Sequence, residues 1–172
     1  MADTFIFKME LDDEVFKRAF FRPDMPKELT SLKRSMTKIA DSWLEYETEQ
    51  FKSQGAVSGI LWRSLKFSTI KEKDRLMRTR RAVSLKPLIR TGRLFASLTV
   101  KGASGQIRRI NEMSVRLGTK IPYAVYHRDT RPFERLNDQI KKKWTEFIQS
   151  DINSKIRAAG TGNPALSDRG PN

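Results

Sequence analysis

The strongest constraint on the fold is an amphipathic stripe between residues 27 and 53. Pro26 suits the first turn of a helix, and Gly55 suits its termination. The pattern therefore predicts a long helix over residues 27–53 that buries one side, with Trp43 in the core. The apolar side chains that follow the i, i+3, i+4 spacing are Leu29, Leu32, Met36, Ile39, Ala40, Trp43, Leu44 and Phe51.

A second stripe predicts a helix over residues 134–157. Three consecutive lysines, Lys141 to Lys143, include its outer face. The residues that follow, 159–172, are rich in Gly, Pro, Ser and Asn, which is typical of a disordered tail. The apolar members of this second stripe are Leu136, Ile140, Trp144, Phe147, Ile148, Ile152 and Ile156.

Shorter segments carry β-type patterns. Residues 4–9 alternate and predict a short strand, and a short helix is expected to follow from Asp12 or Asp13. Three further strands, near residues 98–101, 107–111 and 115–117, are separated by short turns and suggest an antiparallel meander. The whole predicts one α+β domain over residues 1–158, with the long N-terminal-half helix and the long C-terminal helix packed on one face of a small antiparallel sheet.

Positive charge is concentrated in the middle of the chain. The net charge is +14, and residues 63–93 hold 11 basic and 2 acidic side chains. Apolar periodicity is weak there, so an exposed basic loop over about 66–87 is expected, or a poorly fixed helix. This segment could face an acidic partner or DNA, or could simply aid solubility. The candidate partner-facing residues are Lys71, Lys73, Arg75, Arg78, Arg80 and Arg81.

Several chemistries find no support in the residues. The absence of cysteine excludes disulfides, thiolate zinc sites and cysteine nucleophiles, and His127 is the single histidine. No phosphate-binding Gly-Lys-Ser/Thr loop and no nucleophile elbow occur. His127 and Asp129 could form a site, but a histidine held by local hydrogen bonds is the simpler interpretation. We expect no enzyme activity, no metal and no cofactor.

The chain also carries no pattern typical of a membrane protein. No apolar run approaches the ~20 residues of a membrane span. The N-terminus does not show the pattern of a signal peptide. We therefore expect a soluble protein that is made in a cytoplasm and has no membrane partner.

An ordered series of short motifs extends over roughly residues 40–135. The motifs are Phe51-x3-Gly55-x3-Gly59-x2-Trp62-x2-Leu65, Leu88-Ile89-x-Thr91-Gly92-Arg93-Leu94, Leu117-Gly118-Thr119-x2-Pro122-Tyr123-Ala124-x2-His127 and Arg131-Pro132-Phe133. This series resembles the phage virion-morphogenesis, or tail-completion, family, which includes the G protein of Mu-like phages. The chain departs from the family pattern after His127, where members usually continue with a polar residue, a glycine and a loop.

The motif residues are interpreted as a scaffold. Gly92 would let the chain turn sharply so that Leu94 enters the core. Pro122 would begin a short turn or helix that buries Tyr123 and Ala124. The complete scaffold set is Gly55, Gly59, Trp62, Leu65, Thr91, Gly92, Leu94, Gly118, Tyr123, Ala124, His127, Arg131, Pro132 and Phe133.

The resemblance implies a structural virion protein that completes the tail or joins tail to head, as a neck, tail-completion or tail-terminator component. It would be made in the host cytoplasm and reside in the virion, at the head–tail junction or tail end. Its partners would be copies of itself in a closed ring, with sixfold symmetry favoured, and neighbouring neck, connector or tail-tube proteins. Non-specific contact with channel DNA is also implied. The alternative, based on charge, is an accessory protein that binds the DNA backbone through residues 63–93.

Overall fold

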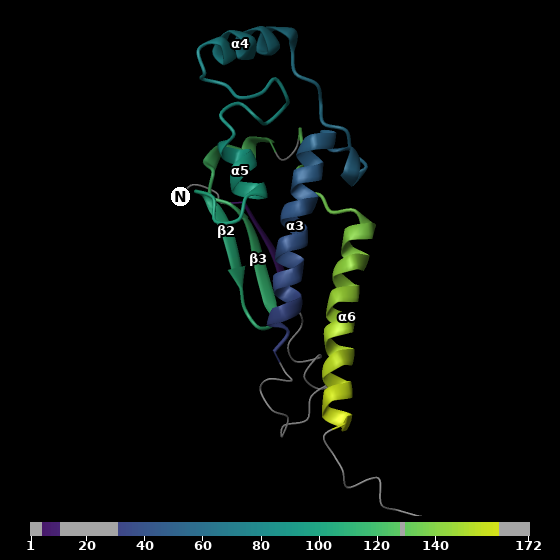
Figure 1. The fold of residues 1–172 in the computed structure, drawn as a ribbon. Coiled ribbons are helices and arrows are strands. Elements are labelled where there is room, and N and C mark those ends of the chain that lie inside the picture. The colour runs from purple at the N-terminus through teal and green to yellow at the C-terminus, as the bar shows by residue number, and fades with distance from the viewer. Residues whose placement is uncertain (1–4, 11–30, 128–129, 162–172) are drawn as a thin grey trace, which may run out of the picture.

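A computed structural model describes residues 5–10, 31–127 and 130–161, and for 5–10 and 159–161 only the backbone is described. The α+β class is confirmed, and Figure 1 shows the elements in space. The short helix expected after Asp12 or Asp13 lies outside the described residues. In chain order the elements are β1 (Phe5–Glu10), α3 (Lys33–Ser53), η1 (Ala56–Ser58), α4 (Phe67–Arg78), α5 (Arg93–Thr99), β2 (Gln106–Ile110), β3 (Ser114–Thr119), η2 (Pro122–His127) and α6 (Asp138–Thr161).

Helix α3 confirms the first predicted helix, although it begins at Lys33. Residues 27–30 of that prediction lie outside the described part of the chain. The backbone N–H of Leu32 donates to the carbonyl of Glu112 at 3.0 Å, which ties the start of α3 to the β2–β3 turn. The helix ends at Ser53, and the next residue, Gln54, has a left-handed backbone (φ 53°) and donates its N–H to the carbonyl of Gln50.

In the described part of the chain the sheet has three strands in the order β1-β3-β2, and both pairs are antiparallel. The predicted strands at residues 4–9, 107–111 and 115–117 are confirmed as β1, β2 and β3. The strand expected at 98–101 is wrong, because residues 93–99 form α5. Leu94 and Leu98 are both buried four residues apart, which is a helical spacing and not the alternation of a strand. The sheet is therefore completed by the N-terminal strand and is not a meander of consecutive strands.

Helix α6 confirms the second predicted helix, with its start at Asp138. It packs against α3, which lies between α6 and the sheet (Figure 1). Trp144 Nε1 donates to Ser42 Oγ at 2.6 Å, and Ser35 Oγ donates to Asp151 Oδ2 at 3.0 Å, so polar contacts accompany the apolar stripe. Residues 159–161, expected in the tail, continue the helix, and the rest of that tail lies outside the described residues.

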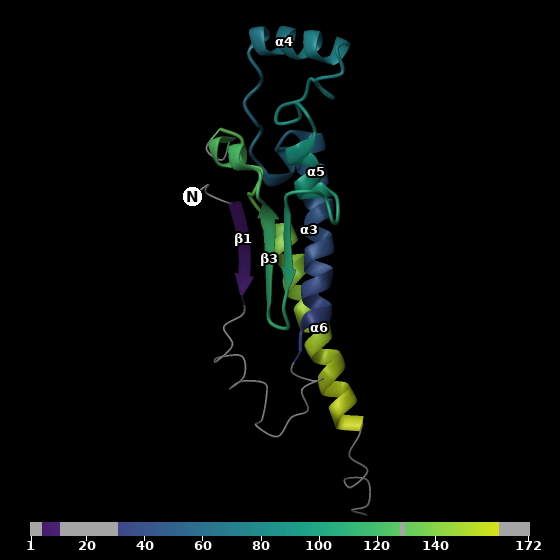
Figure 2. The same cartoon turned by 90° about the vertical axis from the view of Figure 1, so that its left-hand side faces the viewer.

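Residues 60–92 are here called the arm, and the rest of the protein the body. Helix α4 stands away from the body (Figures 1 and 2), whereas Trp62, Leu88 and Ile89, near the two ends of the arm, pack against the core. The prediction of a loop is wrong for residues 67–78, which form α4, so the helical alternative is the one observed. Weak apolar periodicity did not prevent the helix, because Lys73 is buried on its inner side and hydrogen-bonded to the returning chain. In the part of the chain that the structure describes, none of the helices combines the length and apolarity that a membrane span requires.

Candidate functional site: a basic cleft at the base of the arm

A cleft of about 890 Å³ lies between the arm and the body. Three segments line it: the chain that enters and forms α4, the chain that returns to α5, and a third that contributes Tyr123, His127, Thr130 and Arg131. None of the described lining residues is Asp or Glu. The basic residues that line the cleft are Arg63, Lys66, Lys73, Arg81, Arg90, Arg93 and Arg131.

Helix α4 supplies the outer wall of the cleft. Lys66, Thr69, Lys73 and Leu76 line it, and their i, i+3, i+7, i+10 spacing places them on one side of a helix. Lys66 is the residue immediately before the helix, and its extended backbone directs the chain into the first turn. The apolar Leu76 is buried, so this side of α4 combines packing with positive charge.

Lys73 is the most constrained cation of the cleft, since only 6% of its surface is exposed. Its ammonium donates to the carbonyl of Lys86 at 2.5 Å and to the carbonyl of Ile89 at 2.9 Å. These bonds hold the returning chain against α4. Burial lowers the pKa of Lys73, and the nearby charges of Arg131 and Arg90 lower it further.

Arg131 supplies the inner wall and joins two segments distant in sequence. Its Nε donates to the carbonyl of Arg63 at 3.1 Å, and its backbone N–H donates to the carbonyl of His127 at 2.8 Å. Burial lowers the pKa of Arg131, and Arg63 adds to the effect. Burial also lowers the pKa of His127, with a further contribution from Arg131. The cations of this wall therefore repel one another, and an anion in the cleft would relieve that repulsion.

Most of the positive charge is not neutralised within the described part of the chain. Arg90 lies 3.4 Å from a carboxylate oxygen of Glu72. Within the same residues, the side chains of Arg63, Lys66, Arg81 and Arg93 make no ion pair. The electrostatic character of the cleft is thus that of an anion site.

The motif residues divide between the cleft and the core behind it. Those that line the cleft are Leu65, Thr91, Tyr123, His127 and Arg131. Those buried behind it are Trp62, Leu94, Ala124 and Phe133. Gly118 lies in β3, the central strand, opposite Ile6 and Ile107, and Pro132 is half-buried.

Two expectations about the η2 motif need correction. Tyr123 was expected to be buried, but it is 38% exposed because its ring lies at the cleft wall. The His127 ring lies edge-on to Tyr123, with centroids 6.4 Å apart. The side chain of His127 was expected to be held by local hydrogen bonds. Among the described residues, its hydrogen bonds are instead made by its carbonyl, which accepts from the Arg131 backbone N–H and from the Thr130 hydroxyl.

The glycine motifs have different surroundings. A Cβ on Gly55 would lie 2.2 Å from the carbonyl oxygen of Ile60 and 2.5 Å from the Trp62 ring. Trp62 in turn packs edge-on against Phe51, with ring centroids 5.2 Å apart. Gly59 also has positive φ, but its Cβ position is open. Gly92, at φ 77°, directly precedes α5 and allows the turn into Leu94, which is 1% exposed.

The candidate partner-facing residues do not form one surface. Lys73 is buried, so its assignment to an exposed loop is wrong. Arg81 lines the cleft, and Arg78 pairs with Asp74 at 2.9 Å on the exposed side of α4. The other members, Lys71, Arg75 and Arg80, are exposed and do not line the cleft.

Four basic cleft residues were absent from the predicted site: Arg63, Lys66, Arg90 and Arg93. All four lie in the basic segment 63–93, so composition located them but did not assign them to a surface. The helical spacing of Lys66, Thr69 and Lys73 was the available signal for one wall. No signal in the sequence brings Arg131 to the same site.

The donors that line the cleft suit an oxyanion ligand. Guanidinium and ammonium groups, with the hydroxyls of Ser64, Thr69, Thr91 and Thr130, can hydrogen-bond phosphate or carboxylate oxygens. Among the described residues, no cluster of three or more His, Asp or Glu side chains is placed to hold a metal ion. Comparisons of the chain with protein-family models, with curated proteins and with solved structures found no match.

Proposed function

We propose that this chain is a structural, non-enzymatic protein of a tailed-phage virion, which completes the tail or joins tail to head. It acts by assembly: copies associate in a ring, and the arm of each copy docks on a neighbouring copy. The sequence resemblance names the class of protein. Two features of the structure, the arm and the sheet edges, support assembly as its mode of action.

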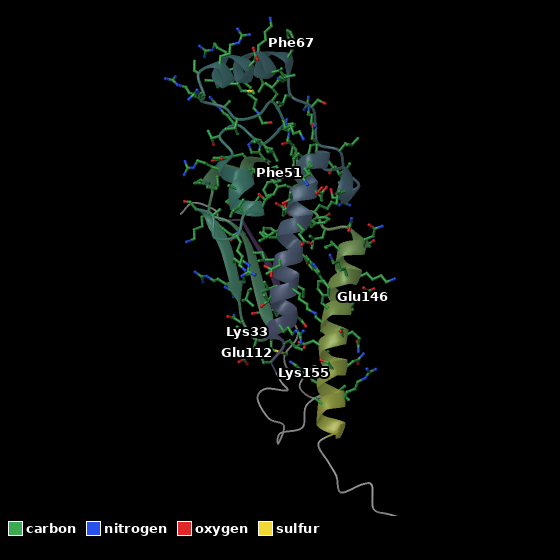
Figure 3. The ribbon with its side chains drawn as sticks, in the orientation of Figure 1. Lys33, Phe51, Phe67, Glu112, Glu146 and Lys155 are labelled. Atoms are coloured by element: carbon green, nitrogen blue, oxygen red, sulfur yellow. The ribbon has the colours of Figure 1, made fainter. Side chains whose placement is uncertain are left out.

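The observation that carries the proposal is the apolar surface of the arm. Six of the ten large apolar side chains that are exposed among the described residues lie on it: Leu61, Phe67, Ile70, Met77, Val83 and Leu85. Leu61 is 75% exposed and Phe67 is 70% exposed, and Figure 3 shows Phe67 on the outermost element. Apolar side chains gathered on a projecting element are typical of a docking surface.

The sheet offers a second means of association. Among the described residues, strands β1 and β2 are its two edges, with β3 between them. An edge strand leaves backbone N–H and C=O groups available to another chain, which favours either pairing between subunits or coverage by a partner. A closed ring of copies would use such edges without forming open fibres.

The motif residues also support the proposal by their position. Segments that lie far apart in the sequence meet where the arm joins the body. The chain passes into the arm near Trp62 and returns from it at Gly92, and Arg131 hydrogen-bonds to Arg63. A scaffold in this place sets the direction of the arm relative to the body. The residues that carry the resemblance are therefore suited to presenting the arm.

Electron microscopy of lysates from a phage with an early stop codon in this gene tests the proposal. We expect filled heads with separate tails, or tails of abnormal length, and rescue by a plasmid copy of the wild-type gene. A matched plasmid copy with Phe67→Ser should rescue poorly. Normal infectious particles without the protein would contradict the proposal.

A further inference from the structure

The cleft at the base of the arm presents hydrogen-bond donors almost exclusively. Five guanidinium groups and two ammonium groups line it, together with four aliphatic hydroxyls and the Tyr123 hydroxyl. No carboxylate and no side-chain amide lies among the described lining residues. The ligand that fits such walls has acceptors along its length and few donors of its own.

This donor excess distinguishes two kinds of polyanion. An acidic peptide brings a backbone N–H at nearly every residue, and each buried N–H requires an acceptor. Apart from one imidazole nitrogen of His127, the described side chains of the cleft offer only hydroxyl oxygens for that purpose. A phosphodiester backbone presents acceptor oxygens, and proteins commonly contact it with arginine, lysine, serine and threonine side chains.

We infer that the cleft between the arm and the body binds the phosphodiester backbone of a nucleic acid. Arg63, Arg81 and Arg93 contact phosphates, since none of them makes an ion pair within the described residues. Lys73 and Arg131 hold the two walls in place through their bonds to backbone carbonyls. The inference stands on the cleft and does not depend on the virion proposal.

The shape of the site limits the ligand to a few nucleotides at a time. A volume of about 890 Å³ lies near the upper end of the range for small-molecule sites, and exceeds what one phosphate needs. Tyr123, 38% exposed at the wall, and the leucines Leu65 and Leu88 provide an apolar surface for a base or sugar. The binding involves no base-specific group, so we expect no sequence preference.

Fluorescence anisotropy with a labelled single-stranded DNA of ~10 nucleotides, and with a duplex of the same sequence, tests the inference. The wild-type chain should bind, with affinity that falls steeply as salt rises. The double variant Arg81→Gln/Arg93→Gln should bind about tenfold more weakly, and the slope of log affinity against log salt should fall by about two. A preference for either strand form supports the inference and identifies which form supplies the phosphodiester.

The matched control is Arg75→Gln/Arg80→Gln, which removes the same charge from the arm outside the cleft. Its affinity should change by less than about threefold, because exposed charges outside the cleft are screened. Equal loss in both double variants would contradict a cleft-specific site. Displacement of the DNA by polyglutamate at equal charge concentration would also overturn the phosphodiester assignment. Thermal unfolding of each variant verifies that the fold is retained, so weak binding is not a loss of structure.

Discussion

The ammonium of Lys73 lies 2.9 Å from the carbonyl oxygen of Ile89, and this contact joins the two halves of the arm. Lys73 stands on α4, and Ile89 lies on the chain that returns to the body. Lys73 is only 6% exposed, and a hydrogen bond from a charged donor is stronger than one between two neutral groups. Removing the ammonium would leave the carbonyl acceptor buried without a donor. The arm is therefore held by a polar anchor where apolar packing is sparse.

Replacement Lys73→Met should loosen the arm while the body stays folded. Two carbonyl acceptors lose their donor, which destabilises the arm by about 1–3 kcal/mol. Hydrogen exchange at the amides of α4 should quicken, with little change in α3 or α6. Lys71→Met, on the exposed side of the same helix, is the control and should leave α4 exchange nearly unchanged. Equal hydrogen-exchange rates for the α4 amides in the two variants would contradict the proposal that Lys73 anchors the arm.

Glu47 makes stability depend on pH. It is fully buried, neither carboxylate oxygen has a hydrogen-bond partner among the described residues, and Glu134 lies close enough to repel it. Burial, and secondarily Glu134, raises the pKa of Glu47 well above the ordinary 4.5. Its stabilising contribution is therefore full below the unfolded pKa and is lost as pH rises through the folded pKa.

Replacement Glu47→Gln removes this titration. At pH 8 the variant should be more stable than wild type by ~1–3 kcal/mol, because no charge is buried without a partner. The difference should shrink as pH falls towards the unfolded pKa. Urea unfolding between about pH 4 and 8 measures it. Glu45→Gln, exposed on the same helix, should show little pH-dependent difference, and a similar profile for both variants would refute the explanation.

Gly55 and Gly59 provide a matched pair for steric strain. Both have positive φ, at 92° and 80°, but only at Gly55 would a Cβ collide with backbone and with the Trp62 ring. Gly59→Ala should cost about 1–2 kcal/mol from the backbone conformation alone. Gly55→Ala should cost clearly more, because Ile60 or Trp62 must also move. Chemical denaturation compares them, and equal losses would show that the collision is relieved without cost.

Phe67 should matter for assembly and not for folding. Its side chain is 70% exposed, so Phe67→Ser should change the free energy of unfolding by less than about 0.5 kcal/mol. Self-association measured by sedimentation should weaken, since an apolar contact between chains is lost. Ile156→Ser, 53% exposed on α6, is the control on the body. If Ile156→Ser weakened self-association more than Phe67→Ser, the interface between copies would lie on the body and not on the arm.

The two long helices and the β2–β3 hairpin could be predicted because periodicity is a local property. Trp43 and Trp144 each stand in a stripe that repeats at helical spacing over several turns, and both are buried, with Trp144 hydrogen-bonded to Ser42 of α3. Strands β2 and β3 are joined by a short turn, so their pairing needs no distant information. The secondary structure of short segments was harder to predict from the sequence. Leu98 belongs equally well to a strand or to the helix α5, and burial of Leu94 beside it decides for the helix.

Only the tertiary structure decided the arm and the cleft. The inner side of α4 has one buried leucine, Leu76, and its stability depends on carbonyls of the returning chain that meet Lys73. The cleft joins Arg63 to Arg131, which lie 68 positions apart and meet through one hydrogen bond, from the Arg131 side-chain Nε to the Arg63 carbonyl. Sequence periodicity reports which side of an element is buried, and charge composition reports how much charge a segment holds. Neither reports which distant segments will share a surface, because that depends on how the elements pack around α3.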